Sequence, residues 1–268
     1  MTITICVAGA TGWTGSLVTR RILESSEFEL VGAIARRDAG KDVGATLGLP
    51  NAGIIIVGTL EEALSTPADV LIDYTQPDSV KARTLSALDR GTRVIVGTSG
   101  LTAADFAEIE ERATVRGLGV IAAGNFSVTA ALAKHFALTA AHYLPSWEII
   151  DYAQANKFDA PSGTAQELAE ALGQTAKNEL ALAIAQTHGA REARGANIAG
   201  AQVHSVRLPG YVLAFEALFG LPDERLTIRH DAGSGAEPYV GGTLLAAKRV
   251  MSVTGLMRGL DTLLFSGA

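Results

Sequence analysis

The sequence predicts an α/β protein: a Rossmann-type parallel-sheet dinucleotide domain followed by a smaller α+β domain. Short apolar runs alternate with helical patterns over residues 4–122, and a glycine-rich turn lies between the first run and the first helix. After Gly124 the alternation stops, and closely spaced strand-like runs follow later in the chain. Alternating strands and helices are typical of a parallel sheet covered on both faces, which binds ligands beyond the carboxyl ends of its strands.

The elements of the first part follow from the spacing of apolar residues. Strands are expected at residues 4–8, 30–35, 54–57, 70–74, 93–96 and 119–122. Helices are expected at residues 16–23, 60–65, 79–89 and 105–115. The first helix carries its apolar residues on one face, at Leu17, Val18, Ile22 and Leu23.

The second part is expected to mix helices with a separate sheet. Helices are predicted at residues 129–143 and 163–172, and strands at 147–153, 202–208, 211–219 and 225–230. The last three strands are joined by short turns, which favours an antiparallel sheet. The polar segment 178–197 is expected to be partly loop. The tail from residue 241 onward is expected to be helical and to return to the first domain. The predicted domains are 1–126, joined by helices in 240–268, and 127–239.

Composition and charge exclude several classes of protein. The 268 residues are 48% hydrophobic and 19% charged, as in a globular protein, and the net charge of −6 comes without a basic run, so we expect no nucleic acid partner. Cys6 is the single cysteine and cannot form a disulfide framework or a cysteine zinc site. No cluster has the spacing of metal ligands, so no metal is expected. No apolar run approaches the length of a membrane helix, and Gly9 interrupts any signal-like start, so we expect no membrane partner and a cytoplasmic protein.

The glycine-rich turn predicts a dinucleotide site. Its glycines provide a tight turn, let the backbone approach a pyrophosphate, and direct the N–H groups of the following helix toward phosphate. The spacing is G-x-x-G-x-x-G, and its position between a strand and a helix supports the assignment. The residues expected to contact the cofactor here are Gly9, Thr11, Gly12, Trp13, Thr14 and Gly15.

The residues after the second strand favour NADPH over NADH. An NAD-dependent enzyme usually has an acidic residue there for the ribose hydroxyls, whereas this chain has Ala35 followed by Arg36 and Arg37. Two guanidinium groups suit a 2′-phosphate. An ordinary solvated pair of surface arginines is the alternative, and NADH remains possible.

The most specific run in the second part is Lys157-Phe158-Asp159-Ala160-Pro161-Ser162-Gly163-Thr164. With it, the chain resembles the bacterial 4-hydroxy-tetrahydrodipicolinate (dihydrodipicolinate) reductases of lysine biosynthesis. The resemblance covers nearly the whole chain, and its runs occur in the same order. They are the opening turn, Ile72-Asp73-Tyr74-Thr75-Gln76-Pro77, Gly97-Thr98-Ser99-Gly100, Asn125-Phe126-Ser127, the lysine run and His204-Ser205-Val206-Arg207.

The resemblance implies a function, a cofactor site and an oligomeric state. The family uses a nicotinamide cofactor to reduce a small cyclic dicarboxylate, 4-hydroxy-tetrahydrodipicolinate, to tetrahydrodipicolinate. Residues 1–126 would then be the dinucleotide-binding domain, and 127–239 would bind substrate and form a homotetramer through its sheet. The further residues implied for the cofactor are Tyr74, Thr75, Gly97, Thr98, Ser99, Asn125 and Phe126.

The lysine run is the expected substrate site. Ser162, Gly163 and Thr164 open a helix, so their N–H groups and hydroxyls suit a substrate carboxylate; a plain helix cap is the alternative. Lys157 is the expected catalytic residue, either as a cation for a carboxylate or as the donor of the proton that complements hydride transfer. Gln154 is expected to hydrogen-bond the substrate.

The chain departs from the family at several positions. Ala153 and Gln154 stand where the family usually has a histidine pair that includes the proposed proton donor, and a glutamine cannot donate that proton at neutral pH. The substitute donors considered are Lys157, Tyr152 or a bound water, and more remotely His204 and His230. The runs Leu208-Pro209-Gly210-Tyr211 and Arg229-His230-Asp231 also differ, and Trp13 replaces a common arginine.

Two alternatives follow from these departures. The chain could reduce another cyclic imine or a keto-acid on the same fold, or it could be a non-catalytic NADPH-binding regulatory protein. The presence of Lys157 beside the run Ser162-Gly163-Thr164 weighs against the second alternative.

Overall fold

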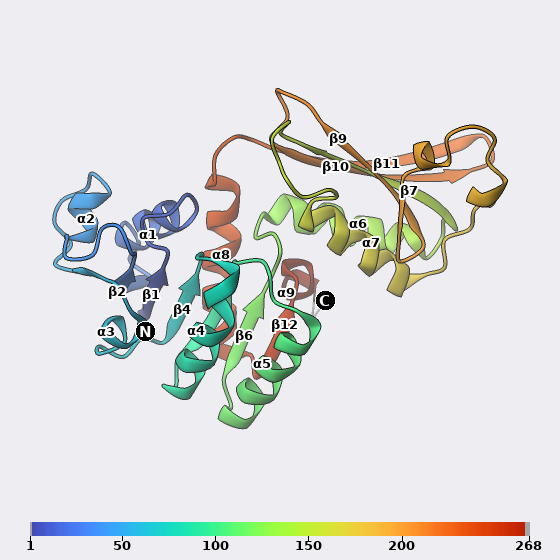
Figure 1. Ribbon diagram of the computed structural model, residues 1–268. Helices are drawn as coiled ribbons and strands as arrows, with labels where there is room; N and C mark the ends of the chain where they lie inside the picture. The colour runs from blue at the N-terminus through green and yellow to red at the C-terminus, as the bar shows by residue number, and fades with distance from the viewer. Residues whose placement is uncertain (1, 266–268) are drawn as a thin grey trace. The chain divides into compact units, whose positions relative to one another are not determined.

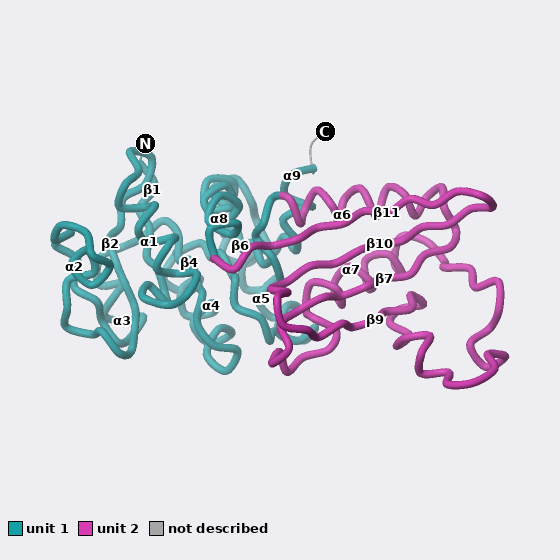
Figure 2. The backbone as a smooth tube through the Cα atoms, turned by 90° about the horizontal axis from the view of Figure 1, so that it is seen from above, with its two compact units in different colours: residues 1–128, 236–268 teal, residues 129–235 magenta. Residues whose placement is uncertain are grey.

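The computed structural model describes residues 2–265 and divides the chain into two compact units. Unit 1 combines Met1–Val128 with the C-terminal segment from Ala236, and unit 2 is Thr129–Gly235 (Figure 2). Each unit contains its own sheet. No helix among the described residues is long and apolar enough to cross a membrane.

Unit 1 is built on a parallel sheet. Its strand order is β12-β6-β5-β4-β1-β2-β3, and every pair recorded in it is parallel. The strands are β1 (Ile3–Ala8), β2 (Phe28–Ile34), β3 (Ile56–Val57), β4 (Val70–Asp73), β5 (Arg93–Val96), β6 (Gly119–Ala122) and β12 (Gly255–Arg258). β4 and β6 are buried along their whole length, as expected for strands that are covered on both faces. The predicted Rossmann-type fold is therefore confirmed.

Helices cover both faces of this sheet (Figure 1). On one face Val80, Leu88 and Ile109 from α4 and α5 pack against alternate strand residues such as Cys6 and Leu71. On the other face α1 packs against α8. The helices of unit 1 are α1 (Gly15–Leu23), α2 (Val43–Thr46), α3 (Leu60–Ala63), α4 (Pro77–Asp89), α5 (Ala103–Arg116), α8 (Glu237–Arg249) and α9 (Leu260–Phe265), with the 3-10 turn η3 (Val250–Ser252).

The C-terminal tail contains a strand where only helix was expected. β12 pairs in parallel with β6, and Met257 lies opposite Ile121. Pairing at this edge satisfies backbone N–H and C=O groups of β6 that would otherwise lack partners. Gly255 enters the strand with φ +84°, a conformation that favours glycine. A strand of four residues shows too little alternation to be distinguished from a helix end by pattern alone.

Unit 2 consists of a mixed sheet with α6 (Val128–Ala141) and α7 (Gly163–Thr175) along one face (Figure 1). The strand order is β11-β10-β7-β9-β8. The strands are β7 (Ser146–Ala153), β8 (Ala196–Ile198), β9 (Ala201–Arg207), β10 (Leu213–Leu221) and β11 (Glu224–Ala232), and the 3-10 turns η1 (Ile184–Gln186) and η2 (Arg191–Arg194) lie between α7 and β8.

The expectation of a purely antiparallel sheet was wrong in one respect. β10 pairs antiparallel with β11 and with β7, but β9 pairs in parallel with β7 and does not neighbour β10. Parallel neighbours need a crossover connection, and α7 supplies it between β7 and β9. Short turns in the sequence indicate where strands end, but they do not determine which strands become neighbours.

Residues of β7 alternate between the two faces of this sheet. Trp147 and Ile149 face the layer of α6 and α7, with Asp151 and Ala153 at the same side, and all of these are buried. The residues that alternate with them, Glu148, Ile150 and Tyr152, face the opposite side and are partly exposed.

Candidate cofactor and substrate sites

The glycine turn has the close packing that its glycines predict. Gly9 has φ +83°, and a Cβ there would lie 2.1 Å from the carbonyl oxygen of Tyr74. A Cβ on Gly15 would lie 2.0 Å from the carbonyl oxygen of Gly9, and the Gly12 N–H donates to that same oxygen at 2.8 Å. No side chain caps the N-terminus of α1 at Thr14. The backbone of this turn is thus open to a phosphate group at the positive end of a helix.

An aromatic pair lies beside this turn. Trp13 follows Gly12 and is 60% exposed, and its ring centroid lies 5.8 Å from that of Tyr239 on α8. Burial raises the pKa of Tyr239 above its ordinary value. Tyr239 was not among the residues proposed from the sequence, because its element lies at the opposite end of the chain.

Arg36 and Arg37 are exposed at the end of β2. The turn is tied to the same strand end, because the N–H groups of Gly9 and Ala10 both donate to the carbonyl oxygen of Ile34. The next residue, Asp38, accepts hydrogen bonds from Lys41 at 3.0 Å and from Thr11, and these lower the pKa of its carboxyl group. The two arginines and one carboxylate therefore lie beside the dinucleotide turn.

A buried carboxylate joins the turns that follow β4 and β5. Asp73 is fully buried and accepts from the Thr75 hydroxyl at 2.6 Å, the Thr98 hydroxyl at 2.9 Å and the Arg83 guanidinium at 2.7 Å. Thr98 also accepts from the Thr75 N–H at 2.7 Å. Asp73 and Arg83 were not proposed as site residues. The only local signal was an acidic residue at the end of an apolar strand, and nothing local paired it with Arg83.

Tyr74 and Phe126 form a packed layer next to these turns. A Cβ on Gly97 would lie 2.2 Å from the ring of Tyr74, so glycine is required where the two turns meet. The Tyr74 hydroxyl lies 2.6 Å from that of Thr243 on α8, and burial raises its pKa. Phe126 is 1% exposed and meets Tyr74 edge-on, so its side chain belongs to the core.

The remaining cofactor candidates also lie at carboxyl ends of strands in unit 1. Ser99 is exposed after β5, and Asn125, after β6, accepts from the Ser127 N–H at 2.8 Å. The structure therefore gathers all cofactor candidates at one edge of the parallel sheet, where ligands bind in this class of fold.

The substrate candidates lie on the loop from β7 to α7 and at the start of α7. Ser162 is the N-cap of α7, and its hydroxyl accepts from the Ala165 N–H at 3.3 Å. The Ser162 N–H and hydroxyl both donate to Asp151, at 2.9 and 2.7 Å. These bonds occupy Ser162. Gly163 and Thr164 are the next two positions, at the positive end of α7, where helix N–H groups suit an anion.

Lys157 lies on the same loop and is about one-third exposed, at 33%. Its ammonium lies 2.6 Å from a carboxylate oxygen of Asp159. Burial is the largest single influence on Asp159 and opposes a low pKa, but the hydrogen bonds and charges around its carboxyl group, led by the bond from Lys157, together lower the pKa. The carbonyl oxygen of Gln154 accepts from the Lys157 N–H at 3.1 Å. Ala153 is fully buried and Gln154 is exposed, so of the two positions only Gln154 presents its side chain to solvent.

The other proton donors considered from the sequence lie elsewhere. Tyr152 and His204 face the side of the sheet opposite α7; Tyr152 donates to Glu216 at 3.3 Å, and His204 bonds Glu148 at 2.8 Å. His230 is buried and lies 3.0 Å from the hydroxyl of Thr129, and burial lowers its pKa. Among the donor residues named from the sequence, Lys157 is the one on the loop that leads into α7.

Within residues 2–265, no group of three or more histidine, cysteine, aspartate or glutamate side chains is arranged to hold a metal ion. The groups present at the candidate positions include backbone N–H groups, hydroxyls, one lysine and guanidinium groups. Such groups bind phosphates and carboxylates.

Comparisons with known proteins agree with this geometry. Two family models match in succession: "Dihydrodipicolinate reductase, N-terminus" over residues 3–126 and "Dihydrodipicolinate reductase, C-terminus" over residues 126–264. A 4-hydroxy-tetrahydrodipicolinate reductase of Moorella thermoacetica is 39% identical over 264 residues, which cover 98% of each chain. The same enzyme of Halalkalibacterium halodurans is 37% identical, covering 98% of this chain and 99% of the relative.

Solved structures show the same relationship. A dipicolinate-bound dihydrodipicolinate reductase from Paenisporosarcina sp. TG-14 superposes with a TM-score of 0.84 and is 30% identical, covering 98% of this chain and 100% of the other. An amine dehydrogenase from Mycobacterium smegmatis has a TM-score of 0.70 at 16% identity over 97% of this chain and 96% of its own, which indicates a shared fold alone.

Proposed function

The chain belongs to the dihydrodipicolinate reductase family, and we propose that it reduces 4-hydroxy-tetrahydrodipicolinate to tetrahydrodipicolinate with a nicotinamide cofactor, in lysine biosynthesis. The observation that carries this proposal is the single loop in unit 2 that carries Lys157 and leads into the start of α7. Together they offer a cation and helix N–H groups to a small dicarboxylate.

The residues of unit 1 fit a nicotinamide dinucleotide. The cradle formed by Gly9 and Gly15 has no room for a Cβ, and the uncapped start of α1 directs N–H groups at the turn, as binding of a pyrophosphate requires. We propose the residues of this turn, with Arg36, Arg37 and the turns after β4, β5 and β6, as the cofactor site. The reduced nicotinamide supplies the hydride when it is bound.

In unit 2, Lys157 and the helix start have complementary roles. Gly163 and Thr164 hold a substrate carboxylate by backbone N–H groups at the positive end of α7. Gln154 donates a further hydrogen bond from its exposed amide. Lys157 exchanges its contact with Asp159 for the substrate and supplies the proton that is consumed when a hydride replaces the 4-hydroxyl group, which leaves as water.

We propose NADPH as the preferred form of the cofactor. Arg36 and Arg37 are exposed beside the turn, where a 2′-phosphate would lie. Asp38 is already engaged by Lys41 and Thr11, so its carboxylate is less available to ribose hydroxyls than an unpaired acid would be.

We also propose a homotetramer that forms through the sheet of unit 2. The face of this sheet opposite α6 and α7 carries partly exposed apolar residues, including Ile150, Val206 and Leu218. Light scattering after size-exclusion chromatography measures the mass directly, and a monomer at micromolar concentration would contradict the proposal.

A coupled assay tests the function. The substrate is generated in situ from aspartate semialdehyde and pyruvate by a separate synthase, and the loss of NADPH absorbance is followed on addition of the chain. We expect oxidation that depends on both precursors. An absence of oxidation, with NADPH binding demonstrated by calorimetry, would overturn the proposal.

A second candidate function is the reduction of another cyclic imine or a keto-acid. It is favoured by Ala153 and Gln154, which leave no histidine at the two positions before the lysine loop. The same assay separates the candidates when it is repeated with other cyclic imines and α-keto-acids, because the true substrate gives the largest kcat/KM.

A further inference from the structure

Arg207 lies at the end of β9, directly beside the strand that leads into the lysine loop. In the parallel pair of β7 and β9, Ser205 lies opposite Asp151 and Arg207 lies opposite Ala153. Asp151, Ser205 and Arg207 thus share the face of the sheet that packs against α7. The Arg207 side chain is 15% exposed, and that of Asp151 is fully buried.

The Asp151 carboxylate receives donors from three residues on two elements, the start of α7 and β9. It accepts from the Ser162 N–H and hydroxyl, from the Ser205 hydroxyl at 3.1 Å and from the Arg207 guanidinium at 2.7 Å. Every partner of Asp151 donates a hydrogen bond, so the site suits a carboxylate, which only accepts. An asparagine at this position would direct its own N–H groups at these donors. A buried carboxylate also needs a paired cation, which Arg207 provides.

Arg207 makes a second contact that reaches the lysine loop. The nitrogen that bonds Asp151 also donates to the backbone carbonyl oxygen of Asp159 at 2.8 Å. The side chain of Asp159 is the ion-pair partner of Lys157. One guanidinium group therefore joins strand β7 to the middle of the loop, while Asp151 joins the same strand to Ser162, the N-cap of α7.

We propose that the Asp151–Arg207 pair is the positioning element of the substrate site. It holds the start of α7 and the Lys157 loop in one arrangement, so that the helix N–H groups and the ammonium meet a dicarboxylate together. Neither residue is proposed to touch the substrate; both act through Ser162 and Asp159. The inference deepens and rests on the proposed function. Lysine is a poor substitute for Arg207, because one ammonium nitrogen would have to replace both terminal nitrogens of the guanidinium, the second of which donates to the carbonyl oxygens of Asp151 and Val206.

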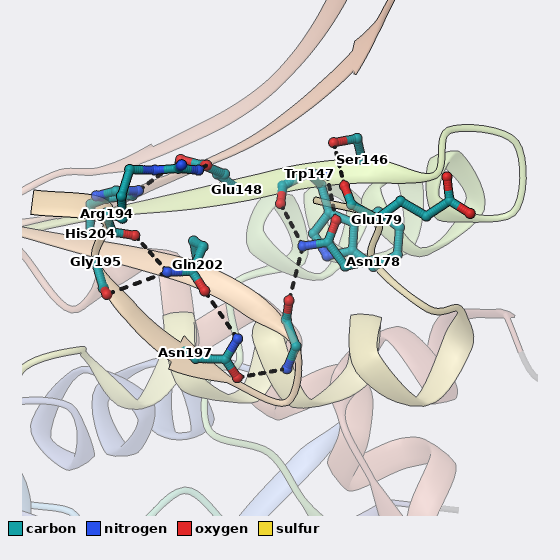
Figure 3. A network of polar contacts seen from close by, with 11 residues as sticks. Ser146, Trp147, Glu148, Asn178, Glu179, Arg194, Gly195, Asn197, Gln202 and His204 are labelled. Carbon is teal, nitrogen blue, oxygen red and sulfur yellow. Dashed lines mark hydrogen bonds and ion pairs between the residues drawn. The ribbon is translucent and has the colours of Figure 1, made fainter. Parts of the chain in front are cut away.

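The same two strands carry a second network that serves as a matched control (Figure 3). On the opposite face of β7, Glu148 accepts from Arg194 at 2.8 Å and from His204 of β9 at 2.8 Å. Gln202 donates to the carbonyl oxygen of Arg194 at 2.7 Å and accepts from Asn197 at 3.0 Å. This network holds Arg194, in the segment before β8, against the sheet. None of the hydrogen bonds just described reaches the start of α7.

The experiment compares Arg207→Lys and Asp151→Asn with Arg194→Lys and Glu148→Gln in the full-length chain. Each pair of variants weakens one arginine–carboxylate contact to β7. The readouts are affinity for dipicolinate and for NADPH by calorimetry, kcat and KM in the coupled assay, thermal unfolding, and amide hydrogen exchange across residues 154–165.

We expect Arg207→Lys and Asp151→Asn to weaken dipicolinate binding and lower kcat/KM by about 10- to 100-fold, as small misplacements of binding groups do. NADPH affinity should be unchanged, and exchange across residues 154–165 should quicken. Arg194→Lys and Glu148→Gln should leave dipicolinate affinity and this exchange at wild-type values even where their thermal stability falls.

Two results would overturn the inference. The first is that Arg207→Lys lowers thermal stability but leaves dipicolinate affinity and kcat/KM at wild-type values. The Asp151–Arg207 pair would then stabilise the fold without positioning the substrate site. The other is equal loss of dipicolinate affinity in the Arg207 and Arg194 variants. A wild-type chain that neither turns over nor binds dipicolinate would overturn the proposed function instead, and hydrogen exchange across residues 154–165 would then decide whether the pair orders the loop.

Discussion

Lys157 is the residue on which the proposed chemistry depends, because it combines charge with a transferable proton. We expect Lys157→Ala to lower kcat/KM by about 10²-fold or more, the range typical of a lost general acid. NADPH affinity should be unchanged, since Lys157 lies in unit 2. Steady-state kinetics and calorimetry measure the two effects.

Lys157→Arg separates the two roles of this side chain. Arginine keeps the positive charge but does not release a proton at physiological pH. If Lys157 is the proton donor, the Arg variant should keep a KM close to wild type and lose kcat. A variant that recovers kcat would show that only the charge is needed and that the proton comes from water.

Arg36 and Arg37 are the residues proposed to set the preference between the two cofactors. We expect the double variant Arg36→Ala/Arg37→Ala to raise the Kd for NADPH by about 10- to 100-fold, because hydrogen bonds to a charged group contribute about 1.5–3 kcal/mol each. The Kd for NADH should hardly change. The control is Arg112→Ala/Arg116→Ala, which removes the same charge from α5, where both arginines pair with Asp89. Equal losses of affinity for NADPH and NADH would contradict the proposal that NADPH is the preferred cofactor.

At the residue scale, the sequence indicates candidate site residues that form continuous runs and misses the buried pairs that join distant segments. The glycine turn and the run from Lys157 to Thr164 are local, so their spacing alone indicates their chemistry. Asp73 and Asp151 are buried carboxylates whose partners, Arg83 and Arg207, lie 10 and 56 residues away. These pairs are recognised only in the folded structure, where α4 brings Arg83 to Asp73 at the end of β4, and β9 brings Arg207 to Asp151 on β7.

At the scale of elements, α8 contributes to the proposed cofactor region from the far end of the chain. Tyr239 contacts the exposed Trp13, and Thr243 bonds the hydroxyl of Tyr74 at 2.6 Å while donating to the Tyr239 carbonyl oxygen at 2.7 Å. One helix thus supports two of the turns that line the cofactor edge of the sheet. Helical spacing predicts the existence of α8, but nothing in it indicates which turns it touches.

Trp13 provides a direct optical test of this arrangement. The chain contains two tryptophans, and Trp147 is buried in unit 2. In a Trp147→Phe variant all indole emission therefore comes from Trp13. We expect NADPH to quench this emission and to gain sensitised emission of its own, because Trp13 follows Gly12 at the phosphate-binding end of α1.

The matched control is Trp13→Phe, in which Trp147 is the only indole and should respond less. Unchanged Trp13 emission at NADPH concentrations that calorimetry shows to be saturating would remove Trp13 from the cofactor site. Tyr239→Leu should weaken NADPH binding without changing the response of Trp147.

At the scale of the whole molecule, unit 1 is assembled from both ends of the chain. Strand β12 pairs with β6, and α8 packs against α1, although the members of each pair are distant in sequence. The parallel sheet is therefore complete only after the C-terminal segment has joined it. The alternating pattern of residues 4–122 predicted the type of sheet. It could not predict the β12 edge or the mixed order of the second sheet, because both depend on pairings between distant segments.

Cys6 reports on the opening of this assembled sheet. It is the single cysteine, is fully buried in β1 between β2 and β4, and burial raises the pKa of its thiol to about 12. A thiol reagent reacts with the thiolate, so labelling requires unfolding of unit 1. A cofactor that binds only the folded unit lowers the unfolded population by the factor 1 + [L]/Kd, so NADPH at about 100 Kd should slow labelling by about 100-fold. Lys157→Ala should show the same protection, because its substitution lies in unit 2. Labelling that proceeds equally fast with and without NADPH would mean that Cys6 becomes accessible through a local opening of β1 that leaves the cofactor edge intact.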